Sequence, residues 1–268
     1  MIYRLTGATV RAIGVAILVM LPTFLLSDTT QSSLEFTRIL ATIASVFVIY
    51  EYGFPTPSVI EFRFAAPYNR VRFLLMVSLI LTPPYLIANM LDGNSITGTI
   101  ATIANNGFAV LDFTYSPVAI VADTLAGSDI AMREAIGQAI ALNVIICISF
   151  ILAFCVSVFA NLWRFGGDNF NMWLNMPTYK SYDISSLQRR LENSSFSSLL
   201  IACLIPLFGP TIASAALTSF SHEGILSPIT ISWVIALWIY LPAMYMMRAI
   251  ALAKIAMGRD DKTQWVPV

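Results

Sequence analysis

The feature that most constrains this chain is a series of long apolar stretches that contain no Asp, Glu, Lys or Arg. A helix needs about 20 mostly apolar residues to cross the roughly 30 Å hydrocarbon core of a bilayer. Six stretches reach that length when the charges at their ends sit at the membrane surfaces. The sequence therefore predicts an all-α integral membrane protein, in which residues 1–268 form a single polytopic membrane domain. The predicted spans cover approximately residues 10–27, 36–52, 73–91, 135–163, 194–220 and 226–250.

Composition supports the same class and excludes others. Hydrophobic residues make up 57% of the chain and charged residues 11%, against about 25% charged residues in a typical soluble domain. So little charge cannot cover a water-facing surface, which excludes a soluble enzyme and a disordered chain. The 15 basic and 15 acidic residues cancel, so there is no charge bias toward nucleic acid.

Residues 93–111 are the doubtful segment, because they are free of charge but rich in Asn, Ser, Thr and Gly. Such polarity suits a re-entrant or surface segment. Six spans with both termini inside would leave only Arg38 and Arg133, of 15 basic residues, on the outer side. A seventh span would retain on the inner side only Arg4, Arg11, Arg63, Arg70, Arg72 and Arg133. We therefore expect six spans with both termini in the cytoplasm. Short loops and few cysteines favour a bacterial cytoplasmic (inner) membrane. The first span has no signal-peptide cleavage site after it and is expected to remain as an anchor.

Short interfacial helices are expected in both long loops. In the outer loop, 93–134, Ser116 and Pro117 form a helix start and Gly127 a helix end, which predicts a surface helix over 117–126. Ser128 is expected to cap the next helix. In the inner loop, 164–192, Ser185 and Gln188 have capping-box spacing. They predict a short helix with Leu187 and Leu191 on one face and Arg189 and Arg190 on the other.

Aromatic and basic residues gather in the two inner loops, 51–72 and 164–192. Phe54, Phe62 and Tyr68 belong to the first of these loops. We interpret both as an inner collar, which either anchors the protein at the membrane interface or offers a docking surface for another protein.

Residues with obvious chemistry are scarce. Ionisable side chains inside a membrane usually mark function, and here all of them can be placed at span ends or in loops. Glu51 comes closest to an exception and is expected to reach the inner interface. With His222 as the sole histidine, no His-ligated haem or metal site is expected, and other cofactors stay unknown. The outer acidic residues are scattered and lack the spacing of a cation-binding loop. Cys147, Cys155 and Cys203 are interpreted as packing residues. No catalytic or metal-binding residue is predicted.

Prolines inside the spans leave one weak candidate site. Pro83 and Pro84 interrupt the third span, and Pro206, Gly209 and Pro210 interrupt the fifth. Breaks of this kind can expose backbone carbonyls and build a solute pathway, although kinked helices also occur in purely structural bundles. The candidate pathway residues are Asn89, Asn143, Pro206, Gly209 and Pro210.

Three functions follow from these observations. The leading hypothesis is a non-catalytic accessory, assembly or scaffold subunit of a larger membrane protein complex, whose partners are the lipid bilayer and other membrane subunits. Small residues at four-residue spacing, such as Ser149, Ala153 and Ser157, favour close helix contacts. The second hypothesis is a transporter or channel for a small neutral or apolar solute. The third is a membrane-embedded lipid-processing enzyme, which would depend on His222, Glu51 or Asp112.

Overall fold

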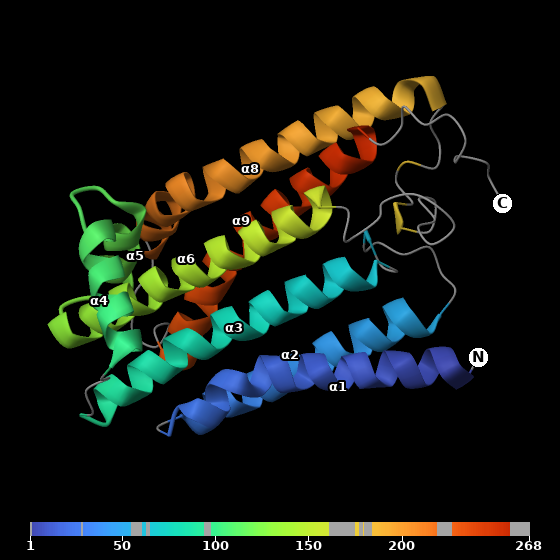
Figure 1. The fold of residues 1–268 in the computed structure, drawn as a ribbon. Coiled ribbons are helices and arrows are strands. Elements are labelled where there is room, and N and C mark those ends of the chain that lie inside the picture. Colours follow the sequence, from blue (N-terminus) through green and yellow to red (C-terminus); the bar gives the residue numbers. More distant parts are fainter. Residues whose placement is uncertain are drawn as a thin grey trace. The chain divides into compact units, whose positions relative to one another are not determined.

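The computed structural model describes residues 2–27, 29–54, 61–62, 65–93, 98–160, 175–176, 179, 184–218 and 227–257. Over these ranges the chain forms eight helices and no strand (Figure 1). The helices are α1 (Ile2–Leu25), α2 (Gln31–Gly53), α3 (Ala66–Leu91), α4 (Thr99–Leu111), α5 (Pro117–Ala126), α6 (Ile130–Phe159), α8 (Ile184–Thr218) and α9 (Pro228–Met257).

Six of these helices are long and apolar enough to cross a membrane, namely α1, α2, α3, α6, α8 and α9. This confirms the predicted multi-pass architecture, and it implies contact with a lipid bilayer. Helix α4 has 13 residues, too few to cross a hydrocarbon core that needs about 20. Several helices begin before the predicted spans, because charged residues at a span end limit burial in lipid but do not interrupt the backbone hydrogen bonds of a helix.

Helix α8 shows this difference most clearly. The short helix predicted near Ser185 and the fifth predicted span are one continuous helix of 35 residues. The prediction of two elements is wrong because no helix-breaking residue separates them. Leu187 and Leu191 are buried and Arg189 and Arg190 are exposed, so the predicted amphipathic faces are confirmed. The side chain of Ser185 and most of the preceding loop, residues 161–183, lie outside the described residues.

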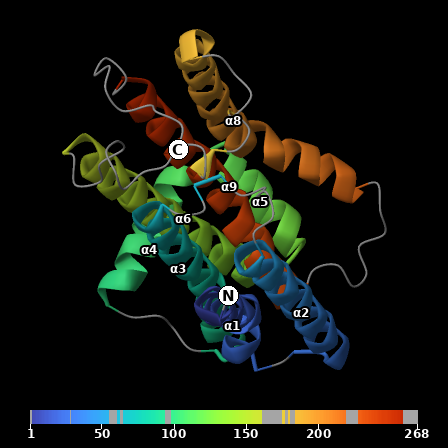
Figure 2. The ribbon, with the colours of Figure 1, turned by 90° about the vertical axis from the view of Figure 1, so that its right-hand side faces the viewer.

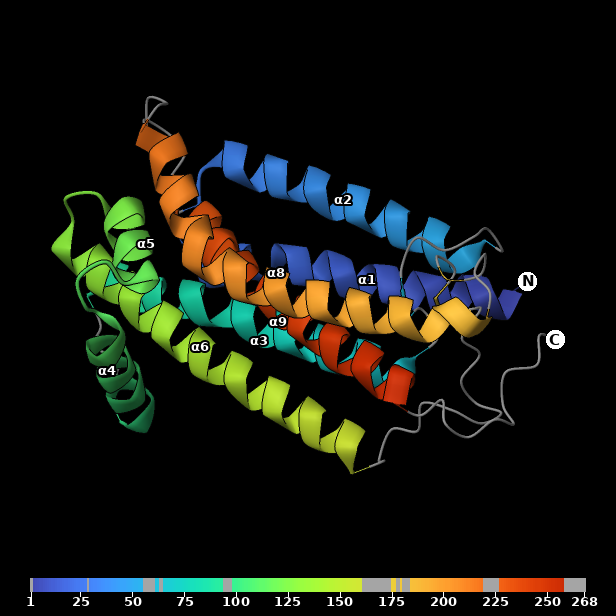
Figure 3. The same ribbon diagram turned by 90° about the horizontal axis from the view of Figure 1, so that it is seen from above.

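The short helix α5 forms where the sequence predicts it. The Ser116 hydroxyl accepts hydrogen bonds from the backbone N–H groups of Val118 and Ala119 at 3.1 and 3.0 Å. Gly127 ends the helix with a positive φ of 62°, a conformation that glycine adopts without strain. Helix α6 is capped by Asp129 and not by Ser128, because the Asp129 carboxylate accepts from the N–H of Met132. Figure 3 shows α4 and α5 beside the start of α6.

The chain divides into two compact units. The first unit comprises Met1–Thr56, Met76–Ile146 and Pro206–Ile239, and the second comprises Pro57–Leu75, Cys147–Ile205 and Tyr240–Val268. Each unit is therefore assembled from segments that are distant in sequence.

In the first unit, α1 and α2 run side by side (Figure 2). Small buried residues, Ala8 and Ala12 in α1 and Ala41 in α2, line the pair. Their size lets the two backbones approach closely. The Ser45 hydroxyl consequently reaches the Ala12 carbonyl of the neighbouring helix at 3.2 Å. Helices α3, α6 and α9 contribute aliphatic residues to the interior of this unit, with fully buried Leu79, Ile80, Ile87, Ile136, Ile140 and Ile235.

The second unit contains an aromatic core. Phe62 and Tyr68 are each 1% exposed, and the Tyr68 ring contacts the rings of Phe62 and Phe154 at centroid distances of 4.7 and 5.6 Å. For Phe62 and Tyr68 the predicted membrane-surface collar is therefore wrong. Their polar neighbours in sequence suggested an interface, whereas the rings pack against other parts of the chain. Phe54 is exposed, as expected of a collar residue.

Phe62 has an unusual backbone, with φ at 60°. A bulky residue seldom adopts this left-handed conformation unless its surroundings enforce it. Here the Phe62 N–H donates to the Asn175 carbonyl at 2.7 Å, and the Phe62 carbonyl accepts from the Asn69 amide at 2.8 Å. Both backbone groups and the buried ring thus hold the residue in place.

Candidate functional site

Asn143 in α6, one of the candidate pathway residues, is fully buried, with 0% exposure. Its side-chain amide donates to the Leu79 carbonyl of α3 at 3.0 Å. Its Oδ1 atom has no hydrogen-bond partner among the described residues. Leaving such an acceptor unsatisfied costs about 1–3 kcal/mol, so Asn143 is an unusual feature of an apolar interior.

Asn89 is placed differently. Its side-chain amide donates to the Tyr85 carbonyl at 2.7 Å, one turn back on α3. This bond is local and partly exposed, and it does not join Asn89 to Asn143. The structure therefore does not bring the two predicted asparagines together through a hydrogen bond.

The predicted break in the fifth span is not a break, because α8 continues through both Pro206 and Pro210. A proline in a helix still leaves the carbonyl four residues earlier without its usual N–H partner. Near this segment, a Cβ atom added to Gly209 would lie 3.7 Å from Nε1 of Trp238 in α9, an ordinary contact. Gly209 is therefore not required for close approach of that ring.

Trp238 carries a second unsatisfied polar atom, which the sequence interpretation missed. Its buried Nε1 donor has no hydrogen-bond partner among the described residues. Tryptophan in a membrane span usually places this N–H at the water interface. The position of Trp238 within an apolar stretch, ten residues after Pro228, was the signal that could have identified it.

A cluster around Arg133 joins α4, α5 and α6 in the first unit. The Arg133 guanidinium donates to both oxygens of Asp112, at 3.1 and 2.8 Å, and through Nε to Asp123 at 2.5 Å. It also lies 5.5 Å from the ring centre of Phe108. Through its hydrogen bonds Arg133 holds the pKa of Asp112 below its ordinary value of 3.8. Acidic residues that looked scattered in the sequence thus converge on an arginine.

A second cluster, around Arg248, lies in the second unit. Arg248 in α9 donates to both carboxylate oxygens of Glu61, at 2.5 and 2.9 Å, and also to the Ser198 hydroxyl of α8. This fork-to-carboxylate geometry is the strong form of an ion pair. Nearby, Arg72 of α3 lies 5.3 Å from the ring centre of Tyr68 and donates to the sulfur of Met244.

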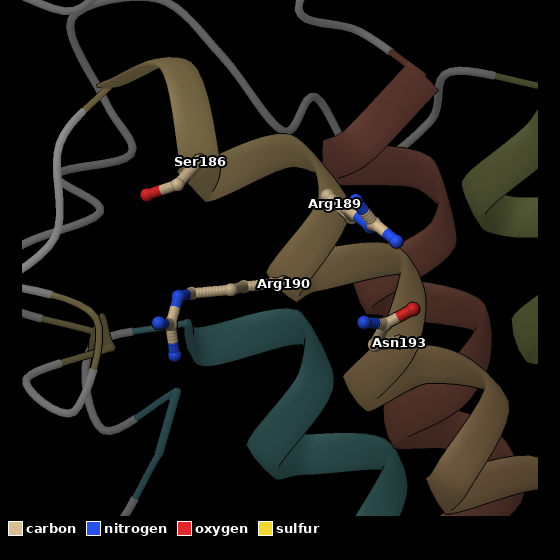
Figure 4. A pocket seen from close by; sticks show the side chains of 4 residues that line it. All are labelled: Ser186, Arg189, Arg190 and Asn193. Atoms are coloured by element: carbon tan, nitrogen blue, oxygen red, sulfur yellow. The ribbon is translucent and has the colours of Figure 1, made fainter.

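An open hollow of about 530 Å³ lies on α8 and is lined by Ser186, Arg189, Arg190 and Asn193. Figure 4 shows Ser186 and Arg190 extending to one side of the helix, with Arg189 above Asn193. Among the described residues, no acidic side chain lines it. Because its walls carry two guanidinium groups, a hydroxyl and an amide, the hollow is suited to an anion with several oxygen atoms.

The structure describes two of the three residues on which the enzyme hypothesis depends. Asp112 is bound to Arg133, and Glu51, near the end of α2, is buried with 2% exposure. His222 lies outside the described residues. Among the residues that the structure describes, no three His, Cys, Asp or Glu side chains are grouped so that they could hold a metal ion.

The fold defines a multi-pass helical membrane protein with ion-paired clusters in its two units. No family model, curated protein or solved structure matches this chain. Its function is therefore argued from its own residues.

Proposed function

We propose that this protein is a non-catalytic accessory, assembly or scaffold subunit that acts by contact with other subunits of a membrane complex. The observation that supports the proposal is an exposed face of α6 in the second unit. There Ser149 and Ala153, one turn apart, are exposed, and Ser157 is half-exposed one turn further on.

Larger apolar side chains flank these small residues. Ile148, Leu152 and Val156 are 52, 59 and 62% exposed. Small residues between larger ones form a shallow channel into which another helix can pack closely, and in lipid such packing is a main source of helix association. The opposite side of α6 is already occupied, since Phe154 and Val158 are buried. The exposed side is therefore available for a helix of another subunit.

The ionic clusters agree with a role without catalysis. Arg133 is bound to two carboxylates and Arg248 to a carboxylate and a hydroxyl. An arginine engaged in this way links helices, and it has few donors left for a substrate.

The direct test is gentle extraction from native membranes, followed by native electrophoresis and mass spectrometry. We expect a large complex of fixed stoichiometry. Ala153→Leu fills the channel and should release the protein from that complex, whereas Val156→Leu, a similar change on the flank, should not. Migration of the unaltered protein as a free monomer or as a homo-oligomer would contradict the proposal.

We further propose that the membrane is the bacterial inner membrane, with both termini in the cytoplasm and α4 and α5 lying at the outer interface. The distribution of Lys and Arg supports this orientation. Single cysteines introduced near Ser116 should react with an impermeant reagent from outside. Those near Ser185 should react only after permeabilisation, and the reverse at Ser185 would refute the orientation.

A second candidate, a pathway for a small neutral solute, is favoured by one observation. Two buried polar atoms of the first unit, Oδ1 of Asn143 and Nε1 of Trp238, have no partner among the described residues. An acceptor and a donor of this kind can bind a polar molecule that passes through an apolar interior. Flux of small neutral solutes into proteoliposomes tests it. Asn143→Leu should abolish flux, while Asn89→Leu should retain it, and absence of flux in the unaltered protein would reject this candidate.

A further inference from the structure

Two adjacent prolines interrupt the hydrogen bonding of α3 without ending the helix. Pro83 and Pro84 both lie inside α3, which continues to Leu91. In an α-helix the carbonyl of residue i accepts from the N–H of residue i+4, and proline has no N–H to donate. Leu79 lies four residues before Pro83 and five before Pro84. Its carbonyl therefore loses both the α-helical donor and the donor that a wider, π-type turn would supply.

Burial keeps water from supplying the missing donor. Leu79 has 0% exposure, and Pro83 and Pro84 are also buried. The charge-free stretch of α3 covers residues 73–91, so the prolines lie near its middle, where lipid offers no hydrogen bonds. A buried carbonyl without a donor is strongly unfavourable in such surroundings. The sequence of α3 thus creates a need that another part of the chain has to meet.

Asn143 supplies the missing donor from a neighbouring helix. Its side-chain Nδ2 atom lies 3.0 Å from the Leu79 carbonyl oxygen, in the first unit, where α3 and α6 run beside each other (Figure 1). Asn143 itself has 0% exposure, and its Oδ1 atom has no partner among the described residues. The hydrogen bond to Leu79 therefore satisfies two buried groups at once, a backbone acceptor of α3 and an amide donor of α6.

Asn89, a second asparagine close to the prolines, differs in both respects. Its amide donates to the Tyr85 carbonyl at 2.7 Å. The residue four positions after Tyr85 is Asn89 itself, which has a backbone N–H to offer to the same carbonyl. The Asn89 side chain thus bonds a carbonyl whose helical donor is not a proline, and the bond stays within one helix. Of the two asparagines, Asn143 alone replaces a missing donor and joins two helices.

We propose that Pro83 and Pro84 form a hinge in α3, and that the hydrogen bond from Asn143 to Leu79 is a latch that holds this hinge in one geometry. The prolines remove backbone hydrogen bonds that would otherwise resist bending. The latch replaces one of them with a bond that depends on the position of α6. Movement of α6 away from α3 consequently releases the hinge. The latch does not depend on the function proposed above, because it is a property of two helices of this chain.

A double-mutant cycle in the purified full-length protein tests the latch. Asn143→Leu removes the side-chain donor, and Pro83→Ala gives the Leu79 carbonyl a backbone N–H. We expect Asn143→Leu to raise the unfolding equilibrium constant about tenfold more when residue 83 is proline than when it is alanine. Unfolding by sodium dodecyl sulfate in mixed micelles measures all four proteins. Removal of the unpartnered Oδ1 atom is common to both backgrounds and cancels in the cycle. Absence of coupling between the two substitutions would overturn the latch.

Asn89→Leu is the matched control, because it deletes the same side-chain amide from a position that also bonds a helix carbonyl. Combined with Pro83→Ala, it should show no coupling. Coupling equal to that of Asn143→Leu would mean that Pro83→Ala alters α3 as a whole, and would refute the assignment to Asn143. If Asn143→Leu does not fold, recovery of folded protein in the double variant with Pro83→Ala supports the latch, and failure of the double variant contradicts it.

Hydrogen exchange followed by mass spectrometry tests the hinge. In Asn143→Leu, the backbone amides of residues 85–91, which follow the prolines, should exchange faster than in the unaltered protein, and those of residues 66–78 should change less. Pro83→Ala should reverse the acceleration, because a continuous helix no longer needs the latch. Equal acceleration along the whole of α3 would indicate a general loss of stability and would contradict a local hinge.

Discussion

The two arginine clusters use similar chemistry in different settings. Arg133 binds Asp112 and Asp123, which lie 21 and 10 positions away in the sequence, and side chains of Arg133 and Asp112 are both 31% exposed. Arg248 binds Glu61, which lies 187 positions away, and these side chains are 24 and 21% exposed. The first cluster links consecutive helices, and the second joins distant parts of the chain.

The difference in sequence separation and exposure implies that the two clusters contribute to stability in different ways. The Arg133 cluster closes short loops, so little chain entropy is lost when it forms, but water and salt weaken its ion pairs. The Arg248 cluster fixes the start of α3 and the segment before it against α8 and α9. Its ion pair is more shielded and stands next to the aromatic core of Phe62 and Tyr68. We therefore expect the second unit to depend more strongly on its cluster.

The largest effect is expected at Phe62. Phe62→Ala removes a buried ring and should lower the free energy of unfolding by about 3–5 kcal/mol. Phe54→Ala, at a ring that is 45% exposed, should change it by less than about 1 kcal/mol. Unfolding of both variants by increasing sodium dodecyl sulfate in mixed micelles measures the difference. Similar losses would show that Phe62 is not the centre of a core.

Glu61→Ala should have the next largest effect. It leaves Arg248 partly buried without its carboxylate, which we expect to cost about 2 kcal/mol, less than the loss for fully buried pairs because both side chains retain some exposure. Asp123→Ala, at the more exposed cluster, should cost less than about 1 kcal/mol. The same unfolding assay at low and high salt sharpens the comparison, because only the Arg133 cluster should respond strongly to salt. Equal losses of unfolding free energy in Glu61→Ala and Asp123→Ala would contradict the proposed difference between the two clusters.

Two helical glycines of the first unit should respond in opposite directions to replacement by alanine. A Cβ atom at Gly137 would overlap the ring of Phe108, so Gly137→Ala should destabilise the packing of α4 on α6 by about 1–3 kcal/mol. At Gly209 the added atom finds an ordinary contact distance. Gly209→Ala should be neutral or stabilise by up to about 1 kcal/mol, because alanine favours helix. Thermal unfolding of both variants in detergent measures the two changes in stability. A loss of stability in both variants would contradict the expected difference between the two glycines.

The smallest expected effect is a pH dependence of the Arg133 cluster. Because the pKa of Asp112 is lower in the folded protein than its ordinary value of 3.8, the ion pair contributes its full stability above that value. The contribution is lost as the pH falls from about 4 through the lowered pKa. Hydrogen exchange in α4 and α5 should accelerate over this range more than exchange in α3. In Arg133→Gln the additional acceleration should disappear, and its persistence would assign the effect to another group.

The sequence predicted the elements that depend on local signals. Six spans followed from hydropathy, and α5 followed from Ser116, Pro117 and Gly127, because apolar runs and caps act within a few residues. It also identified Asn143 as a polar residue among apolar neighbours. The hydrogen bond from the Ser45 hydroxyl to the Ala12 carbonyl and the pairing of Glu61 with Arg248 could not be predicted, since contacts between different elements leave no periodic pattern in one sequence.

The errors have a related cause. Phe62 and Tyr68 were assigned to the membrane surface because charged residues surround them in the sequence. The structure buries both rings, and it pairs Glu61, the neighbour of Phe62 in the sequence, with Arg248, which lies 187 positions away. Asp112 and Asp123 are likewise separated in the sequence. The turn between α4 and α5 brings both carboxylates within hydrogen-bond distance of Arg133. Patterns within a few neighbouring residues therefore predict the helices, but they do not predict the ion pairs between residues far apart in the sequence.

The pairing of α1 with α2 bears on how the protein is made. The two helices are joined by residues 26–30 alone, and the Ser45–Ala12 hydrogen bond and the small residues that line the pair all lie within the first 53 positions. Partners so close in sequence meet at little entropic cost. This hairpin has all its own contacting surfaces as soon as its second helix leaves the ribosome. The two helices can therefore enter the bilayer as an already paired helical hairpin. The helices that are synthesised later then insert into a membrane that already contains this hairpin.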